Sequence, residues 1–197
     1  MIQILRNRFL TKEKPPFQSF IQTDVHAHWL PGIDDGARNI EESLLLIENL
    51  VKIGYRQLIA TPHVMSDYYP NQPADILAAF ETVQKAVAES QISVKLSFAA
   101  EYYLDEWLWA QLAQQQKLLS FGKNYVLFET AFGNAPPFLE SAIRQMQLLG
   151  YRPVLAHPER YQYFWEDEKR LFQLKDQGLL LQVNLNSLRG YYSLPAE

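Results

Sequence analysis

The stretch GYRQLIATPH, residues 54–63, and its counterpart GYRPVLAHP, residues 150–158, decide the predicted fold. Each stretch begins with a glycine directly after a segment of helical periodicity, where a left-handed helix cap favours glycine. Each continues through a short apolar run and ends on a histidine beside a proline. An apolar run without polar alternation is typical of a strand buried on both faces. The two stretches therefore predict matching units in which a helix leads into a strand.

The same alternation continues along the chain after residue 20. The predicted strands are Ile21–Val25, Gln57–Thr61, Val94–Ala99, Tyr125–Glu129, Pro153–His157 and Leu179–Asn184. Helices are predicted from Asn39, from Pro73, over Asp105–Gln115, from Pro136-Pro137 and over Asp167–Gln177. Strands that alternate with helices predict an α/β protein with a parallel sheet. A barrel is favoured over an open sheet because no glycine-rich phosphate loop follows the first strand.

Composition narrows the class of protein. The 197 residues are 48% hydrophobic and 20% charged, which suits one globular domain. The absence of cysteine excludes disulfides, thiolate zinc sites and cysteine nucleophiles, and it fits a reducing compartment such as the cytoplasm. Residues 1–20 are basic and are predicted to form an amino-terminal extension, with the domain over residues 21–197.

The net charge and the length of the apolar runs argue against two kinds of partner, nucleic acid and the membrane interior. The formal net charge is −4 although residues 1–20 are basic, so the body of the chain is more acidic still. An acidic body disfavours binding to nucleic acid, whose phosphates attract lysine and arginine. No apolar run approaches the roughly 20 residues that a membrane span requires. We therefore expect a protein without a membrane span and without a nucleic-acid partner.

All four histidines fall at the carboxyl ends of predicted strands. His26 and His28 end the first strand, His63 ends the second and His157 ends the fifth. In an α/β barrel these ends open onto one face, where active sites are built. A single histidine at such a position is more often structural, but four of four predict a metal site.

Carboxylates join the histidines. Glu101 directly follows the third strand and Glu129 ends the fourth. A charge at the end of an apolar strand is costly unless it is paired with a basic side chain or bound to a cation. Asp34 and Asp35 lie in the loop after the first strand. Turn chemistry alone explains one aspartate beside a glycine. Two adjacent aspartates near His26 and His28 indicate that at least one of them is a ligand. Imidazole and carboxylate together suit Mn²⁺, Fe or Zn²⁺.

Arg160 follows His157 by three residues. A guanidinium in this place can bind two phosphate oxygens at once. The alternative is a surface ion pair with Glu159 or Glu166. Clustered divalent ions and an arginine together predict chemistry at phosphorus.

These motifs resemble the CpsB/CapC family of bacterial tyrosine-protein phosphatases, within the polymerase-and-histidinol-phosphatase (PHP) superfamily. The resemblance runs from about Thr23 to Gln182. The motifs that carry it are His26-Ala27-His28, Leu30-Pro31-Gly32-Ile33-Asp34-Asp35-Gly36, Glu41-Glu42-Ser43, Ala60-Thr61-Pro62-His63 and Ala156-His157-Pro158-Glu159-Arg160.

The resemblance implies a distorted (β/α)7 barrel that holds three metal ions, usually manganese. His26 and His28 would bind the first ion, with Glu101 bridging it to the second. Glu129 and His157 would complete the second site. Asp35 and His63 would serve the third, with Asp34 as a substitute.

The same resemblance implies a mechanism and a partner. Arg160 would hold the phosphate while a metal-bridging hydroxide attacks phosphorus in line, without a phosphoenzyme. The substrate would be the phosphotyrosine tail of a bacterial tyrosine kinase that controls capsule or exopolysaccharide export.

The chain departs from the family pattern in one respect. The family ends its metal set with Asp-x-His on a seventh strand, and no such motif occurs before Glu197. We therefore expect the seventh βα unit to be missing, with the domain over residues 21–197 incomplete at its carboxyl terminus. Two other functions stay open. One is hydrolysis of a small phosphate monoester such as histidinol phosphate, and the other is a non-catalytic domain that binds metal or a partner. The sequence does not decide the oligomeric state.

Overall fold

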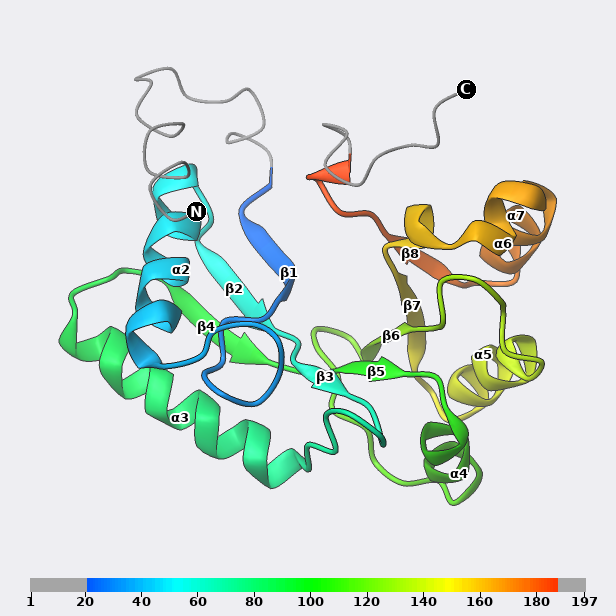
Figure 1. Cartoon of the computed structure of the whole chain (residues 1–197), viewed down its shortest axis with the longest axis horizontal. Helices are drawn as coiled ribbons and strands as arrows, with labels where there is room; N and C mark the ends of the chain where they lie inside the picture. Colours follow the sequence, from blue (N-terminus) through cyan, green and yellow to red (C-terminus); the bar gives the residue numbers. More distant parts are fainter. Residues whose placement is uncertain (1–20, 188–197) are drawn as a thin grey trace.

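A computed structural model describes residues 21–187 (Figure 1). The predicted extension, residues 1–20, lies outside the described residues, as do residues 188–197. The strands are β1 (Thr23–Ala27), β2 (Gln57–Ala60), β3 (His63–Val64), β4 (Lys95–Phe98), β5 (Glu101–Tyr103), β6 (Tyr125–Glu129), β7 (Arg152–Ala156) and β8 (Leu180–Gln182). The helices are α2 (Ile40–Ile53), α3 (Pro73–Glu89), α4 (Glu106–Ala113), α5 (Leu139–Leu148), the 3-10 helix η2 (Pro158–Arg160), α6 (Gln162–Glu166) and α7 (Glu168–Asp176).

Every strand ladder in residues 21–187 is parallel. One sheet has the order β1-β2-β4 and the other the order β3-β5-β6-β7-β8. The chain runs directly from β2 into β3 and from β4 into β5, and backbone pairing continues up to both bends, because Ala99 N donates to Ala60 O at 2.8 Å and Glu101 N donates to Pro62 O at 2.9 Å. β2 and β3 therefore form one bent strand, and β4 and β5 form a second. The two sheets continue into one another at these bends. The predicted α/β class with parallel strands is confirmed.

The bends were not predicted. The second predicted strand, Gln57–Thr61, agrees with β2 to within one residue, but the short strand β3 that follows at His63 was not predicted, nor was β5 after the third predicted strand. Pro62 explains the break between β2 and β3, because proline has no N–H to donate to a ladder. The fourth helix begins at Leu139, later than the predicted Pro136-Pro137, and η2 and α6 occupy a region for which no helix was predicted.

The ladder does not close into a barrel within the described part of the chain. β1 pairs with β2 alone and β8 pairs with β7 alone among residues 21–187. A side-chain contact nevertheless spans the two edges, since Gln182 Oε1 lies 2.6 Å from His26 Nδ1. The curvature of the parallel strands is compatible with a barrel, but residues 21–187 do not form a closed one.

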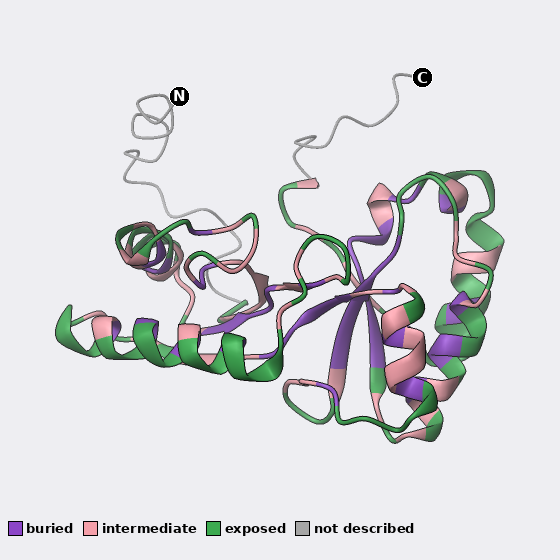
Figure 2. Cartoon of the chain, turned by 60° about the horizontal axis from the view of Figure 1, so that its bottom comes forward, coloured by how far each residue is buried: buried purple, intermediate pink, exposed green. Residues whose placement is uncertain are grey.

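The core lies between the strands and the helices outside them. In Figure 1, α2 and α3 flank the sheet of β1, β2 and β4, while α4 to α7 flank the larger sheet. Figure 2 shows buried strands and helices whose outer faces are exposed. Leu58 and Phe128 from the strands, and Ile76 and Met146 from the helices, belong to one buried cluster. This packing of the helices against the strands holds the ends of the strands in place.

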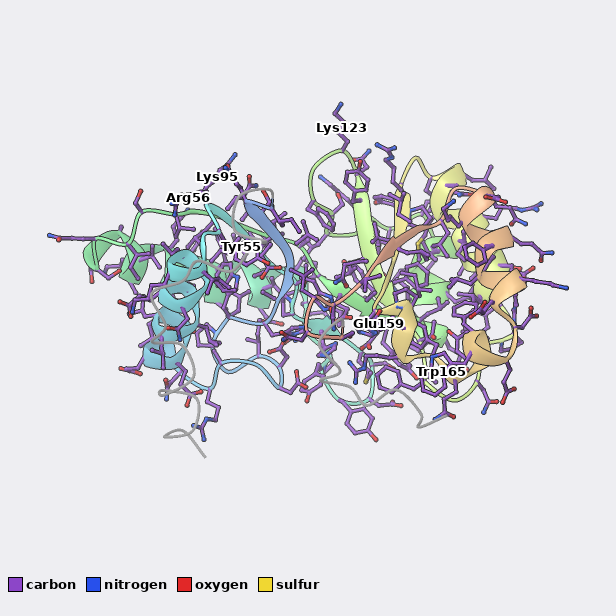
Figure 3. All side chains as sticks on the ribbon, turned by 90° about the horizontal axis from the view of Figure 1, so that it is seen from above. Tyr55, Arg56, Lys95, Lys123, Glu159 and Trp165 are labelled. Atoms are coloured by element: carbon purple, nitrogen blue, oxygen red, sulfur yellow. The ribbon has the colours of Figure 1, made fainter. Side chains whose placement is uncertain are left out.

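The carboxyl ends of the strands lie on one side of the molecule. In Figure 3, Arg56, Lys95 and Lys123, which precede or begin strands, point to one side, whereas Glu159, which follows β7, lies on the other. Gly54 and Gly150 have φ of 117° and 81°, so the predicted left-handed glycines at the helix ends are confirmed. No helix in residues 21–187 has the length and apolar character that crossing a membrane requires.

Candidate metal centre

The structure brings all four histidines together at the carboxyl ends of the strands. His26 lies in β1 and His28 follows it, His63 begins β3 and His157 follows β7. The ring centroids are 5.3 Å apart for His26 and His28, 4.6 Å for His28 and His63, and 5.6 Å for His26 and His157. Three strands that are distant in sequence therefore contribute to one cluster of imidazoles.

Glu101 lies at the centre of this cluster. Its Oε2 atom is 3.0 Å from His26 Nε2, 3.3 Å from His28 Nε2 and 3.3 Å from His63 Nδ1. Its Oε1 atom is 3.1 Å from His157 Nε2. The side chain is buried, which alone would raise its pKa, but the imidazoles around it, His26 foremost, hold the pKa well below the usual range. Glu101 is therefore an ionised carboxylate with an imidazole on every side.

Glu129 faces two of the same imidazoles from the end of β6. Its Oε1 atom lies 3.0 Å from His63 Nδ1 and its Oε2 atom lies 3.6 Å from His157 Nε2. His157 is buried and adopts a left-handed backbone, with φ of 34° and ψ of 57°. Residues other than glycine rarely adopt this conformation, and where they do so the strain often belongs to a functional site. The bend directs the ring of His157 back toward the two glutamates.

The two adjacent aspartates have different surroundings. The side chain of Asp34 is fully buried, and its Oδ2 atom accepts from His28 Nδ1 at 2.7 Å and from His63 N at 3.1 Å. Its Oδ1 atom accepts from Gly36 N at 2.9 Å. Asp35 is 65% exposed, and its Oδ1 atom lies 3.5 Å from His63 Nε2. Asp34 thus orients a histidine, whereas Asp35 reaches the open side of the cluster.

The hydrogen bonds of His26 and His28 leave their other nitrogens facing one another. Both Nδ1 atoms lie against oxygen acceptors, Gln182 Oε1 and Asp34 Oδ2, so each Nδ1 carries the hydrogen. When both rings are neutral, the two Nε2 atoms present lone pairs, 3.3 Å apart and within 3.3 Å of Glu101 Oε2. Three acceptors in contact repel unless positive charge lies among them. The donor set therefore fits a cation.

The electrostatics of His28 show the same need for positive charge. Burial disfavours the charged imidazolium, but hydrogen bonds with Asp34 and Glu101 outweigh it and raise the pKa of His28 to about 10. Without a metal, a second proton on His28 supplies the positive charge, and a bound cation would take the place of that proton. His63 Nδ1 and His157 Nδ1 are buried without a hydrogen-bond partner. His63 Nδ1 is near Glu129 Oε1, but at an angle unsuited to a hydrogen bond. A metal ion would give the His63 lone pair a partner and would supply the positive charge.

Three groups of side chains in the described residues have ligand atoms within 4.8 Å of one another. They are His26, His28 and Glu101; His28, Asp35 and His63; and His63, Glu101 and Glu129. His157 is outside these groups but contacts both glutamates. A mixture of imidazole and carboxylate suits Mn²⁺, Fe or Zn²⁺. All seven side chains that the sequence singled out as metal ligands therefore lie in one centre.

Arg160 lies beside this centre, at the end of η2. Its Cζ atom is 4.2 Å from the ring centroid of Phe132, a distance typical of a cation–π contact. Phe132 lies 5.9 Å from the ring of His157 and stacks on Tyr161 at 5.8 Å. The guanidinium is therefore held by an aromatic side chain that also contacts a histidine of the centre.

Three residues of the site were missed from the sequence. They are Gln182, Phe132 and Tyr69, whose ring stacks on His63 at 5.5 Å. Asp34 was named as a candidate ligand, but nothing in the sequence marked its role in orienting His28. Gln182 is a polar residue at the end of an apolar run, the same signal that identified Glu129, and this pattern could have revealed it.

Comparisons with known proteins identify a family and several relatives. The family described as "Capsular polysaccharide synthesis, CpsB/CapC" matches residues 22–196. The chain is 32% identical over 169 residues to the tyrosine-protein phosphatase YwqE of Bacillus subtilis (strain 168), covering 86% of this chain and 66% of that protein. It is 26% identical over 161 residues to the tyrosine-protein phosphatase CpsB of Streptococcus pneumoniae, covering 82% of this chain and 66% of CpsB.

A solved structure is similar as well. It comes from the crystallographic study of YwqE from Bacillus subtilis and CpsB from Streptococcus pneumoniae, described there as unique metal-dependent tyrosine phosphatases. The TM-score is 0.78 at 34% identity, over 85% of this chain and 68% of that one. The chain thus spans about two thirds of the length of these relatives. The family match over nearly the whole chain, together with these relatives, shows that the chain belongs to the CpsB/CapC family.

Proposed function

We propose that the protein is a metal-dependent protein-tyrosine phosphatase that acts in capsular or exopolysaccharide synthesis. One observation carries the proposal: Glu101 Oε2 and the Nε2 atoms of His26 and His28 are in mutual contact, and this arrangement needs positive charge, which a bound cation would supply. The relatives named tyrosine-protein phosphatases, and the metal dependence stated for the solved structure, support the choice of reaction.

The ligands would divide among up to three divalent ions. His26 and His28 would hold the first, Glu101 would be shared between the first and the second, and Glu129 and His157 would complete the second. Asp35 and His63 would serve a third. Two of the three ligand groups support the first and third sites, and the contacts of His157 with both glutamates support the second. The absence of thiolate ligands supports Mn²⁺, with Fe or Zn²⁺ as alternatives. When bound, such cations lower the pKa of a coordinated water and offset the charge on phosphoryl oxygens.

The protein's own side chains position the phosphate. Arg160 presents a planar guanidinium that matches two phosphate oxygens, and Phe132 restricts its orientation. Asp34 keeps the Nε2 atom of His28 directed inward. The sequence has no cysteine, so the reaction cannot proceed through a cysteinyl-phosphate intermediate.

We infer that the strands belong to a distorted (β/α)7 barrel of the PHP type. The continuous parallel order through both sheets supports this inference, as does the likeness in fold to the solved relative. We place the protein in the cytoplasm and infer that its substrate is the phosphotyrosine tail of a bacterial tyrosine kinase. The absence of cysteine supports the first inference, and the names of the relatives support the second.

The test combines metal analysis with a choice of substrates. Purified protein should contain two or three ions per chain, and with added Mn²⁺ it should release phosphate from a phosphotyrosine peptide faster than from histidinol phosphate. A preference for histidinol phosphate would replace the proposal with hydrolysis of small phosphate monoesters. One ion or none per chain, without turnover of either substrate, would favour a non-catalytic domain.

A further inference from the structure

A chain of hydrogen bonds leads from the 3-10 helix η2, which follows β7, to His26 of the centre. Glu159 Oε1 accepts from Asn184 N at 3.1 Å and from Ser187 Oγ at 2.7 Å. Gln182 Nε2 donates to Asn184 Oδ1 at 2.9 Å, and Gln182 Oε1 lies 2.6 Å from His26 Nδ1. Glu159, labelled in Figure 3, thus anchors the segment that follows β8.

The direction of each bond in this chain is determined. Because Gln182 Nε2 donates to an asparagine oxygen, the glutamine presents its oxygen to His26. An oxygen can only accept, so His26 Nδ1 carries the hydrogen, and in the neutral ring Nε2 keeps its lone pair. Nε2 is the nitrogen that faces Glu101 at 3.0 Å. The glutamine therefore fixes both the tautomer and the orientation of the ring.

The position of this contact gives it a further effect. His26 belongs to β1 and Gln182 to β8, the two strands at which the sheet order ends within residues 21–187. No backbone pairing joins these two strands in the described part of the chain, so the side-chain bond is what holds His26 to the β8 edge. A contact that served only to pack β8 would not need to present an acceptor to a ring nitrogen.

We propose that Gln182 is a positioning residue for His26, itself held by Asn184 and Glu159, and that it keeps the Nε2 atom of His26 available to a divalent cation. This inference rests on the proposed function in so far as His26 is a ligand. Groups that hold the second nitrogen of a ligating histidine affect metal affinity by about 10- to 100-fold.

The test compares two substitutions at one position by Mn²⁺ titration calorimetry. Gln182→Met keeps the length of the side chain but removes the acceptor, and Gln182→Glu keeps an acceptor. We expect Gln182→Met to weaken Mn²⁺ binding about 10- to 100-fold. Gln182→Glu should stay close to the wild type, as should the control Gln173→Met, on the exposed face of α7. Equal Mn²⁺ affinity in Gln182→Met and the wild type would overturn the inference.

A second measurement separates this inference from the proposed function. The nitrogen chemical shifts of His26 report its tautomer in NMR spectra, with or without a diamagnetic ion such as Zn²⁺. The inference predicts that the wild type carries the hydrogen on Nδ1 and that Gln182→Met loses this preference; an unchanged tautomer would refute it. A wild type that binds no metal would sink the proposed function instead, and the tautomer would still decide the role of Gln182.

Discussion

His28 Nδ1 lies 2.7 Å from Asp34 Oδ2, and the same oxygen accepts the backbone N–H of His63. One buried carboxylate thus ties a ring that follows β1 to the backbone of β3. Its neighbour Asp35 makes no comparable set of bonds and is 65% exposed. Two adjacent residues of the same type therefore have separate tasks, and this difference can be measured.

Asp34→Ala should destabilise the protein, and Asp35→Ala should not. Removing the Asp34 carboxylate leaves the N–H groups of His63 and Gly36 without their acceptor, which costs about 1–3 kcal/mol in the free energy of unfolding. The exposed Asp35 should change this free energy by less than about 0.5 kcal/mol. Urea unfolding of both variants, with chelator present, makes the comparison. Equal losses of stability would contradict the separate roles.

Gly36→Ala should damage the metal centre although it changes no polar side chain. A methyl group at this position would collide with the backbone oxygen and Cβ of His28, and backbone atoms cannot move aside as a flexible side chain can. We expect a loss of about 1–3 kcal/mol in stability and weaker Mn²⁺ binding. Gly133→Ala is the matched control, because nothing lies within 4 Å of a methyl group there. Normal Mn²⁺ binding in Gly36→Ala would show that His28 tolerates displacement.

Glu101→Gln should abolish turnover and lower the metal content by at least one ion per chain. The neutral amide removes the charge that faces His26, His28 and His157. Metal analysis by mass spectrometry and phosphate release from a phosphotyrosine peptide provide the measurements. Glu140→Gln should leave both unchanged, because Glu140 is exposed and pairs with Arg170 at the surface. Full metal content in Glu101→Gln would rule out its bridging role.

Arg160→Ala should lower kcat/KM for a phosphotyrosine peptide while the metal content stays at the wild-type value. Arg160→Lys should recover little of the loss, because an ammonium lacks the planar pair of donors. Arg170→Ala, on the surface of α7, is the control. Unaltered kinetics in Arg160→Ala would remove the arginine from phosphate binding.

Phe132→Ala tests whether the aromatic ring orients this arginine. A cation–π contact contributes about 0.5–2 kcal/mol, so kcat/KM should fall about 2- to 30-fold. Phe132→Tyr keeps a ring and should retain most of the activity. If Phe132→Ala has full activity, the guanidinium is held by other groups.

The sequence by itself determined the class of fold, and it predicted the side chains of the candidate metal centre. Apolar runs and helical periodicity placed the longer strands and helices to within a few residues, because local patterns of burial fix them, but the short elements β3, β5, η2 and α6 were not predicted. Four histidines and two glutamates at strand ends predicted a shared site, because parallel strands deliver their carboxyl ends to one face. The order of motifs identified the family, and the comparisons confirmed it.

Only the tertiary structure decided what each of these groups faces. It separated Asp34 from Asp35, which are equivalent in a sequence pattern, although the first side chain is buried and the second is 65% exposed. It added the short strands β3 and β5 beyond the ends of the second and third predicted strands, where the surface bends. It also placed Gln182 against His26 across 156 positions of sequence. Such contacts depend on how whole strands pack, and no local pattern records that packing.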